Sequence, residues 1–139
     1  VSQFYTNLKE LPSQDLVVVL DACFSGRTQE GLLFENVSPA QLVTTQRQEV
    51  DLSEGVLLSS AQGDELSVWY PQKRHSLFTY YFLKGLRGNA DQDGDGRITA
   101  GEIMQYASDR VPSKAAMVAN RRQNPELNGD QSLVLTDLD

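Results

Sequence analysis

A run of branched apolar residues at 16–20, which gives way at once to small and polar residues, constrains the fold more than any other segment. This pattern predicts a buried strand, Leu16–Leu20, that ends in a loop. In open α/β sheets, ligand-binding and catalytic groups gather at the carboxyl ends of the strands. Cys23, the single cysteine, lies just past this strand, so we predict that it is a nucleophile. The alternative is a buried thiol that packs as a small hydrophobe.

Asp21 lies two residues before Cys23, and the two side chains share a face if the strand geometry continues through them. A carboxylate disfavours a neighbouring thiolate unless a cation offsets it. Both residues can therefore serve catalysis if Asp21 faces a positively charged group of the substrate and an imidazolium lies beside the Cys23 thiolate. We predict that Asp21 binds a basic side chain of the substrate.

Residues 21–26, Asp-Ala-Cys-Phe-Ser-Gly after a Val-rich strand, resemble the nucleophile segment of the caspase-like cysteine peptidases, most closely the metacaspases and their bacterial relatives. Residues 55–61 and 76–83 resemble the next core strand and the following helix of that family. The resemblance implies an α/β fold, a three-layer α/β/α domain on a mostly parallel sheet. It also implies a cysteine endopeptidase, for which we expect cleavage of polypeptides after Arg or Lys.

The catalytic histidine of the resembled family precedes the cysteine, inside a short His-Gly segment that this chain lacks. The one histidine, His75, follows Cys23 and directly precedes a predicted helix, so we interpret it as structural rather than as the general base. Residues 1–139 are then the carboxyl-terminal larger part of one catalytic domain. On this interpretation the histidine belongs to a missing amino-terminal part, and the chain is inactive on its own.

The resemblance also suggests a substrate pocket in the loop that follows the second predicted strand, Leu57–Ala61. Asp64 or Glu65 would join Asp21 in holding a Lys or Arg side chain, because carboxylates pair with guanidinium groups through charge-assisted hydrogen bonds. Trp69 would form a wall of this pocket with its large apolar face. The alternatives are ordinary surface carboxylates and a core tryptophan.

Residues 91–102 match the twelve-residue EF-hand calcium loop. Asp91, Asp93 and Asp95 occupy its first, third and fifth positions, Gly96 its sixth and Glu102 its twelfth. Calcium takes about six to eight oxygen ligands, and alternating acids on a tight loop bring their carboxylates together. We predict a Ca²⁺ site formed by these acids, to which Arg97 contributes its backbone carbonyl and Thr99 a bridging water.

A polar turn is the alternative for the same segment. Thr99 and Glu102 have the spacing of a capping box for the next helix, which is also compatible with calcium binding. The acids of this loop would repel one another without a cation, and a simple turn leaves that unexplained. If the loop 91–102 is the functional site and Cys23 is only a buried thiol, the chain is a calcium-responsive binding module. A caspase-like scaffold without catalysis is a further alternative.

Size and charge fit one acidic domain. The chain has 139 residues, 40% of them hydrophobic, and a formal net charge of -7. That charge argues against nucleic acid and favours basic partners or cations. We expect no membrane span and no signal peptide, and a single cysteine favours a cytoplasmic location.

The remaining segments complete the predicted order of elements. We expect helices over Ser2–Leu11 and Leu77–Leu86, and a third helix with Ile103, Tyr106 and Val111 on one face. The loop 27–53 is either a processing site cut after Arg27 or Arg47 or a solvated loop with at most a short helix or hairpin. After Pro112 we expect an irregular basic segment, and then a loop at 124–129 before a final strand, Ser132–Leu135, that completes the sheet.

Overall fold

The computed structural model of this protein describes residues 6–8, 10–13, 15–21, 27–28, 31–32, 55–63 and 65–138. Cys23, Asp64, Arg47 and most of the loop 27–53 lie outside these residues. The strands are β1 (Leu16–Leu20), β2 (Arg27–Thr28), β3 (Gly31–Leu32), β4 (Gly55–Ser59), β5 (Trp69–Tyr70), β6 (His75–Ser76), β7 (Arg97–Thr99), β8 (Glu126–Gly129) and β9 (Val134–Asp137). The helices are α2 (Leu77–Lys84), α3 (Ala100–Ser108) and α4 (Val111–Ala119), with two single turns, η1 (Pro71–Lys73) and η2 (Gly85–Asn89).

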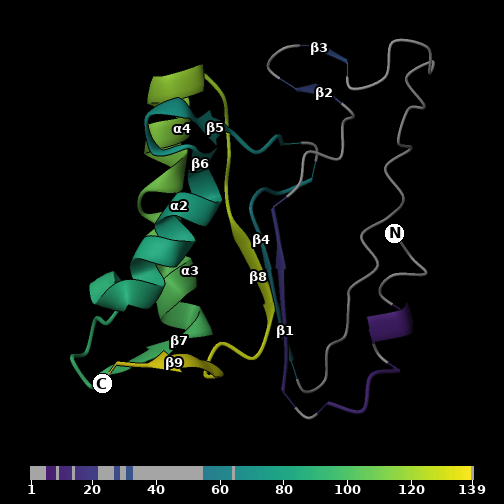
Figure 1. The fold of residues 1–139 in the computed structure, drawn as a ribbon, viewed down its shortest axis with the longest axis vertical. Coiled ribbons are helices and arrows are strands. Elements are labelled where there is room, and N and C mark those ends of the chain that lie inside the picture. Colours follow the sequence, from purple (N-terminus) through teal and green to yellow (C-terminus); the bar gives the residue numbers. More distant parts are fainter. Residues whose placement is uncertain are drawn as a thin grey trace.

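A three-stranded sheet in the order β1-β4-β8 forms the centre of the fold. β1 and β4 run parallel, whereas β8 is antiparallel to β4, so the described part of the sheet is mixed. Helices α2, α3 and α4 lie together on one side of it (Figure 1). The α/β class is confirmed, and β1 has the bounds that the sequence predicts.

The core lies between the sheet and these helices. Val56 and Leu58 of β4 have no exposed surface, and neither do Leu77 and Phe78 at the start of α2. Burial of each such side chain stabilises the fold by about 1.5–3 kcal/mol. β4 is buried because it is the middle strand, with β1 on one side and β8 on the other.

β4 and β8 approach closely at a pair of glycines. Gly129 has a φ of 113°, and a Cβ on it would lie 2.1 Å from the carbonyl oxygen of Gly55. Only glycine allows both that backbone conformation and that approach. The next residue, Asp130, donates its backbone N–H to Gly55 at 3.0 Å, which fixes the end of β8 on the sheet.

Two sequence predictions for the carboxyl-terminal region are wrong. The strand that joins the sheet is Glu126–Gly129, in the segment predicted as a loop, because Leu127 pairs with Leu58 and packs on the core. The later strand, β9, pairs with β7 in a separate two-stranded ribbon instead of completing the sheet.

The helix predicted across residues 103–111 is divided, and the segment after Pro112 is helical rather than irregular. α3 ends at Ser108 and α4 begins at Val111, with Pro112 in its first turn. Proline is tolerated there because the first backbone N–H groups of a helix have no intrahelical partner. Val111 and Ala115 are buried, so packing and not propensity fixes this helix.

Other predicted segments are described only in part. Residues 6–8 of the predicted helix Ser2–Leu11 are helical. In the loop 27–53 the structure describes the short hairpin of β2 and β3. None of the helices in the described ranges is long and apolar enough to cross a membrane.

Candidate functional site

Asp21 directly follows β1 and connects that strand to the start of α2. Its Oδ2 accepts hydrogen bonds from the Ser76 hydroxyl, from the Thr79 hydroxyl at 2.6 Å and from the Thr79 backbone N–H at 3.2 Å. Ser76 is also the N-cap residue of α2 and accepts from the same N–H at 3.3 Å. A carboxylate at this end of a helix is stabilised by the unpaired N–H groups and by the helix dipole.

The second oxygen of Asp21 has a different environment. Oδ1 is buried and has no hydrogen-bond partner among the described residues. A buried carboxylate oxygen without a donor is costly, since it has lost its hydration. Asp21 can therefore accept a further hydrogen bond from a cationic group at the carboxyl end of β1, directly before the segment that contains Cys23.

The loop 60–68 follows β4 at the same end of the sheet and is held by residues from before β8. Gln123 is fully buried; its Oε1 accepts from the Val68 backbone N–H and its Nε2 donates to the Ser60 carbonyl, both at 2.9 Å. Every hydrogen bond of this clamp crosses from one chain segment to another. These bonds fix Ser60 and Val68, at the two ends of the loop, relative to each other.

Glu65 reinforces the same attachment. Its Oε2 accepts from the Asn124 backbone N–H at 2.7 Å, and its Oε1 accepts from the Asn124 side-chain amide at 2.6 Å. Oε2 also accepts from the Gln62 backbone N–H at 3.3 Å. Both oxygens of the predicted substrate ligand Glu65 are thus used to hold the loop in place.

Trp69 and His75 lie on the two strands of the hairpin after this loop. The core alternative for Trp69 is wrong, because 47% of its surface is exposed. His75 is exposed as well, in β6 at the entrance of α2, where Ser76 and not the imidazole caps the helix.

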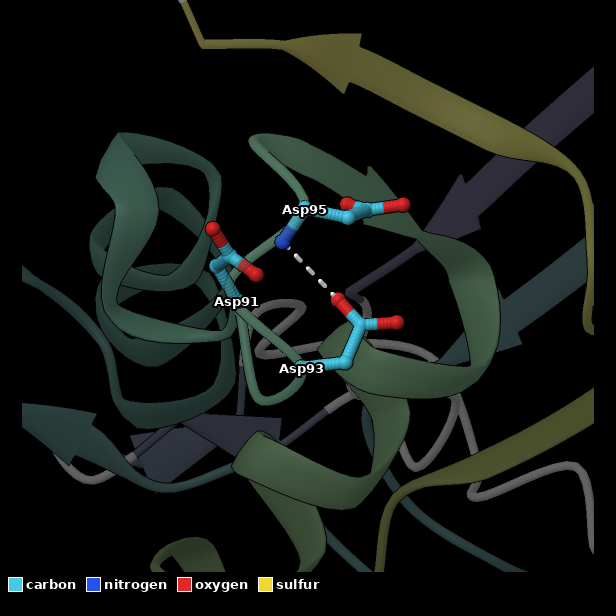
Figure 2. Close-up of side chains that lie close together, drawn as sticks. All are labelled: Asp91, Asp93 and Asp95. Atoms are coloured by element: carbon cyan, nitrogen blue, oxygen red, sulfur yellow. Dashed lines mark hydrogen bonds between the residues drawn. The ribbon is translucent and has the colours of Figure 1, made fainter.

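The acidic loop lies at the other end of α2, beyond η2. Figure 2 shows Asp91, Asp93 and Asp95 around one turn of the loop, and each offers a carboxylate oxygen within 4.8 Å of the others. Backbone N–H groups support them: Gly94 and Gly96 donate to the two oxygens of Asp91 at 2.8 and 3.2 Å. Gly96 has a φ of 80°, which lets the chain turn where the motif requires glycine.

Glu102 closes this loop and starts α3. It forms the predicted capping box: the Thr99 backbone N–H donates to Oε2 at 2.9 Å, and Thr99 Oγ1 accepts from the Glu102 backbone N–H. Oε1 accepts from the Gln92 backbone N–H at 3.1 Å, so the twelfth position touches the second. The hydrogen bond from the Thr99 N–H is the main cause that lowers the pKa of Glu102, with that from Gln92 adding to it.

The loop is anchored between the core and β9. Ile98, in β7, is fully buried in the core. β7 also pairs with β9, which holds the end of the loop from the other side. Arg97 directs its side chain to Asp137, with Nε 3.3 Å from Oδ1, so its guanidinium is engaged outside the ring of acids. The Leu138 backbone N–H donates to the Gly96 carbonyl at 2.7 Å.

Sequence reasoning missed four residues of these sites. Ser76 and Thr79 hold Asp21, while Gln123 and Asn124 hold the loop 60–68. The serine before an apolar helix is a detectable N-cap signal. Gln123 has no local signal, since its partners are distant in the sequence. Cys23 and Asp64 stay predictions, because they lie outside the described residues.

Comparison with known families identifies the domain to which this chain is similar. The family model of the caspase domain, Peptidase_C14, matches residues 1–133. Neither a search of curated proteins nor a search of solved structures gave a match.

Proposed function

This chain belongs to the caspase-domain family of peptidases, and on that premise we propose that it is the carboxyl-terminal larger part of a cysteine endopeptidase domain that cleaves after Arg or Lys. Family membership itself supports a cysteine peptidase that acts on polypeptides. The preference for a basic residue rests on Asp21.

The buried Oδ1 of Asp21 is the observation that carries this preference. Oδ2 is occupied by Ser76 and Thr79, whereas Oδ1 has no donor among the described residues. A guanidinium or ammonium group would supply that donor and compensate the charge, and a carboxylate would be repelled. The site therefore favours substrates with a basic side chain before the cut.

The proposed reaction begins with the Cys23 thiolate. Its sulfur attacks the carbonyl carbon, a C–S bond forms, and the Cys23 backbone N–H helps to hold the oxyanion. A histidine from outside this chain takes the thiol proton and returns it to the leaving amine as the C–N bond breaks. His75 is not proposed for this step, because the family order places the histidine before the cysteine.

The position of β1 within the described part of the sheet supports a further segment that brings this histidine. β1 is at the edge of the described sheet. Val17 and Val19 pair with Val56 and Leu58 and share their side of the sheet, yet they are 42% and 39% exposed. We propose that the amino-terminal part of the same domain covers these valines.

Within the pocket, we propose Asp64 as a second carboxylate and Trp69 as an apolar wall. The exposed ring of Trp69 supports the second assignment. For Glu65 we propose a positioning role instead of direct substrate contact, because both of its oxygens bind the loop and Asn124.

Alkylation of Cys23 tests the proposal directly. A peptidyl alkylating reagent that carries arginine should label the chain in the presence of its amino-terminal part, and the aspartate version should not. Asp21→Asn should lower the rate of labelling by the arginine reagent by about tenfold, the effect of about 1.4 kcal/mol. Thr79→Val is the matched control. It removes the hydrogen bond from the Thr79 hydroxyl but keeps the negative charge of Asp21, so it separates loss of that bond from loss of the charge.

Mass spectrometry after digestion identifies the labelled residue. Failure of both reagents to label Cys23 would contradict the peptidase proposal and favour a non-catalytic caspase-like scaffold. Equal labelling by both reagents would contradict the preference for a basic residue but leave the nucleophile in place.

We propose calcium binding as a second function, carried by the carboxylates of Asp91, Asp93 and Asp95. Their mutual approach within 4.8 Å and the ordered turn at Gly96 fit an oxygen-ligated divalent cation. Glu102 would complete the ligand set, and Arg97 would contribute its carbonyl. Bound Ca²⁺ would neutralise the mutual repulsion of these acids.

Titration calorimetry with CaCl₂ tests this function without any peptidase assay. The chain should bind one Ca²⁺, and Asp93→Asn together with Asp95→Asn should abolish binding. Glu10→Gln together with Asp109→Asn changes the charge equally at exposed carboxylates outside the loop and should leave it intact. No heat of binding for the unmodified chain would contradict the calcium proposal.

A further inference from the structure

The hairpin of β5 and β6 presents basic residues on an acidic chain. Lys73, Arg74 and His75 follow one another at its tip, and all three are exposed. Arg74 has a φ of 55°, a left-handed conformation that is uncommon outside glycine. Its backbone N–H donates to the Tyr70 carbonyl at 3.0 Å, so the turn that carries these side chains is closed.

Two tyrosines below this tip hold a pair of lysines. Tyr70 and Tyr80 meet edge to face, with ring centroids 5.4 Å apart. The ammonium of Lys73 lies 5.6 Å from the centre of the Tyr80 ring, and that of Lys114 lies 5.3 Å from the centre of the Tyr70 ring. Segments that are distant in sequence, η1 and α4, thus bring two cations onto one aromatic pair.

The charges of this surface are not neutralised by the described part of the chain. The one ion pair among the described residues joins Arg97 to Asp137, and neither residue belongs to this surface. Lys73, Arg74 and Lys114 have no carboxylate within ion-pair distance among the described residues. An aromatic ring attracts an ammonium but adds no negative charge, so the surface keeps its net positive charge.

We infer that Lys73, Arg74 and Lys114, together with Tyr70 and Tyr80, form a docking surface for an acidic polypeptide segment. Carboxylates would pair with the guanidinium of Arg74 and with the two ammonium groups, which lie against the rings of Tyr80 and Tyr70. Nucleic acid is disfavoured, because a long polyanion would also meet the acidic remainder of a chain of net charge -7.

The docking surface lies next to the proposed substrate site. The basic tip leads directly into Ser76, which donates to Asp21. Figure 1 shows β5 and β6 at the opposite end of α2 from the β7–β9 ribbon. If the chain acts as the proposed peptidase, its substrates would combine a basic residue before the cut with acidic residues nearby. That extension rests on the proposed function, whereas the docking itself does not.

Fluorescence anisotropy of a labelled oligoglutamate peptide tests the docking on the full chain. The peptide should bind at an ionic strength of about 0.1 M and be released at about 1 M, where the Debye length falls from about 10 Å to about 3 Å. Trp69 is the single tryptophan and precedes Tyr70, so its emission should change on binding. An oligolysine peptide of equal length should not bind.

Charge reversal identifies the binding residues. Lys73→Glu with Lys114→Glu should weaken binding of the peptide by about tenfold or more, at up to about 1 kcal/mol for each exposed pair lost. Lys84→Glu with Arg87→Glu makes the same charge change at exposed positions at the other end of α2 and should weaken binding by less than about twofold. The milder Lys73→Gln with Lys114→Gln should give an intermediate loss with an unchanged circular dichroism spectrum.

Three results would overturn the inference. They are no binding of oligoglutamate at low ionic strength, equal weakening by the two charge-reversal pairs, and tighter binding of an oligonucleotide of the same charge. Cys23→Ala should bind the peptide as well as the unmodified chain does. This comparison separates failure of the docking surface from failure of the proposed peptidase.

Discussion

The acidic loop, residues 91–102, and the sheet edge at the carboxyl end of β1, where Asp21 lies, differ in how far apart in the sequence their interacting residues are. The loop gathers its carboxylates and their backbone donors within residues 91–102. At the edge, by contrast, Asp21 and Thr79 are 58 positions apart, and Gln123 and Ser60 are 63 apart. A short motif can specify a cation site through its own backbone, whereas a substrate site at a sheet edge depends on the docking of distant segments.

Removal of the Gln123 clamp should have the largest effect. Gln123→Leu leaves the Val68 N–H and the Ser60 carbonyl buried without partners, which should lower the free energy of unfolding by about 2–6 kcal/mol. Urea denaturation measures this loss. Gln105→Leu, at an exposed position on α3, should change stability by less than about 0.5 kcal/mol. Equal effects of the two substitutions would show that the clamp does not hold the loop 60–68.

Calcium should stabilise the loop region by a smaller amount. On our proposal Ca²⁺ binds only the folded chain, so at one hundred times its dissociation constant it should raise the free energy of unfolding by about 2.7 kcal/mol. A thermal melt with CaCl₂ and then with a chelator measures the difference. Asp93→Asn should remove most of it, and Asp109→Asn none. A shift that persists in Asp93→Asn would place the bound ion elsewhere.

Loss of one bond to Asp21 should cost less again. Thr79→Val removes the hydroxyl that lies 2.6 Å from Oδ2 and keeps the shape of the side chain. We expect a loss of about 1.5 kcal/mol in the free energy of unfolding, as for a hydrogen bond to a charged group. Thr136→Val, whose hydroxyl donates to the adjacent Asp137 carbonyl at 3.3 Å, should cost less than about 0.5 kcal/mol. Similar losses in the two variants would mean that the hydrogen bond from Thr79 in α2 to Asp21 does not stabilise the fold.

The smallest effect concerns Asp130, in the turn between the sheet and the β7–β9 ribbon. Hydrogen bonds from the Ser132 hydroxyl at 2.7 Å and its N–H at 2.8 Å lower the pKa of Asp130. A carboxyl group whose pKa is lower in the folded chain than in the unfolded chain stabilises the fold at pH values above its unfolded pKa. This stabilisation is lost as the pH falls through the folded pKa. Asp130→Ala should therefore destabilise the chain at neutral pH more than at acidic pH. A deficit that is the same at all pH values would contradict this role.

Local patterns predicted the local parts of the molecule. The run of branched apolar residues at 16–20 predicted β1, and the spacing of Thr99 and Glu102 predicted the capping box of α3. The spacing of the acids, with glycine at the sixth position, predicted the turn at Gly96. The partners of Asp21 and the clamp of Gln123 could not be predicted, because their contacts depend on how α2 and β8 pack. Glu126–Gly129 looked like a loop since its strand character comes from pairing with β4.

The pairing of β7 with β9 has a consequence for the order of assembly. β9 follows β8 in the chain, so it is synthesised after β8, which pairs with β4. The β7–β9 ribbon that supports the acidic loop can therefore form only after β8 has been synthesised. Such long-range pairing closes slowly compared with a local turn. During synthesis, the loop would exist for some time without its supporting strand, and the calcium affinity that we propose for it would reach its full value when residues 134–138 emerge. Cation binding at 91–102 would thus report that the chain has been completed through β9.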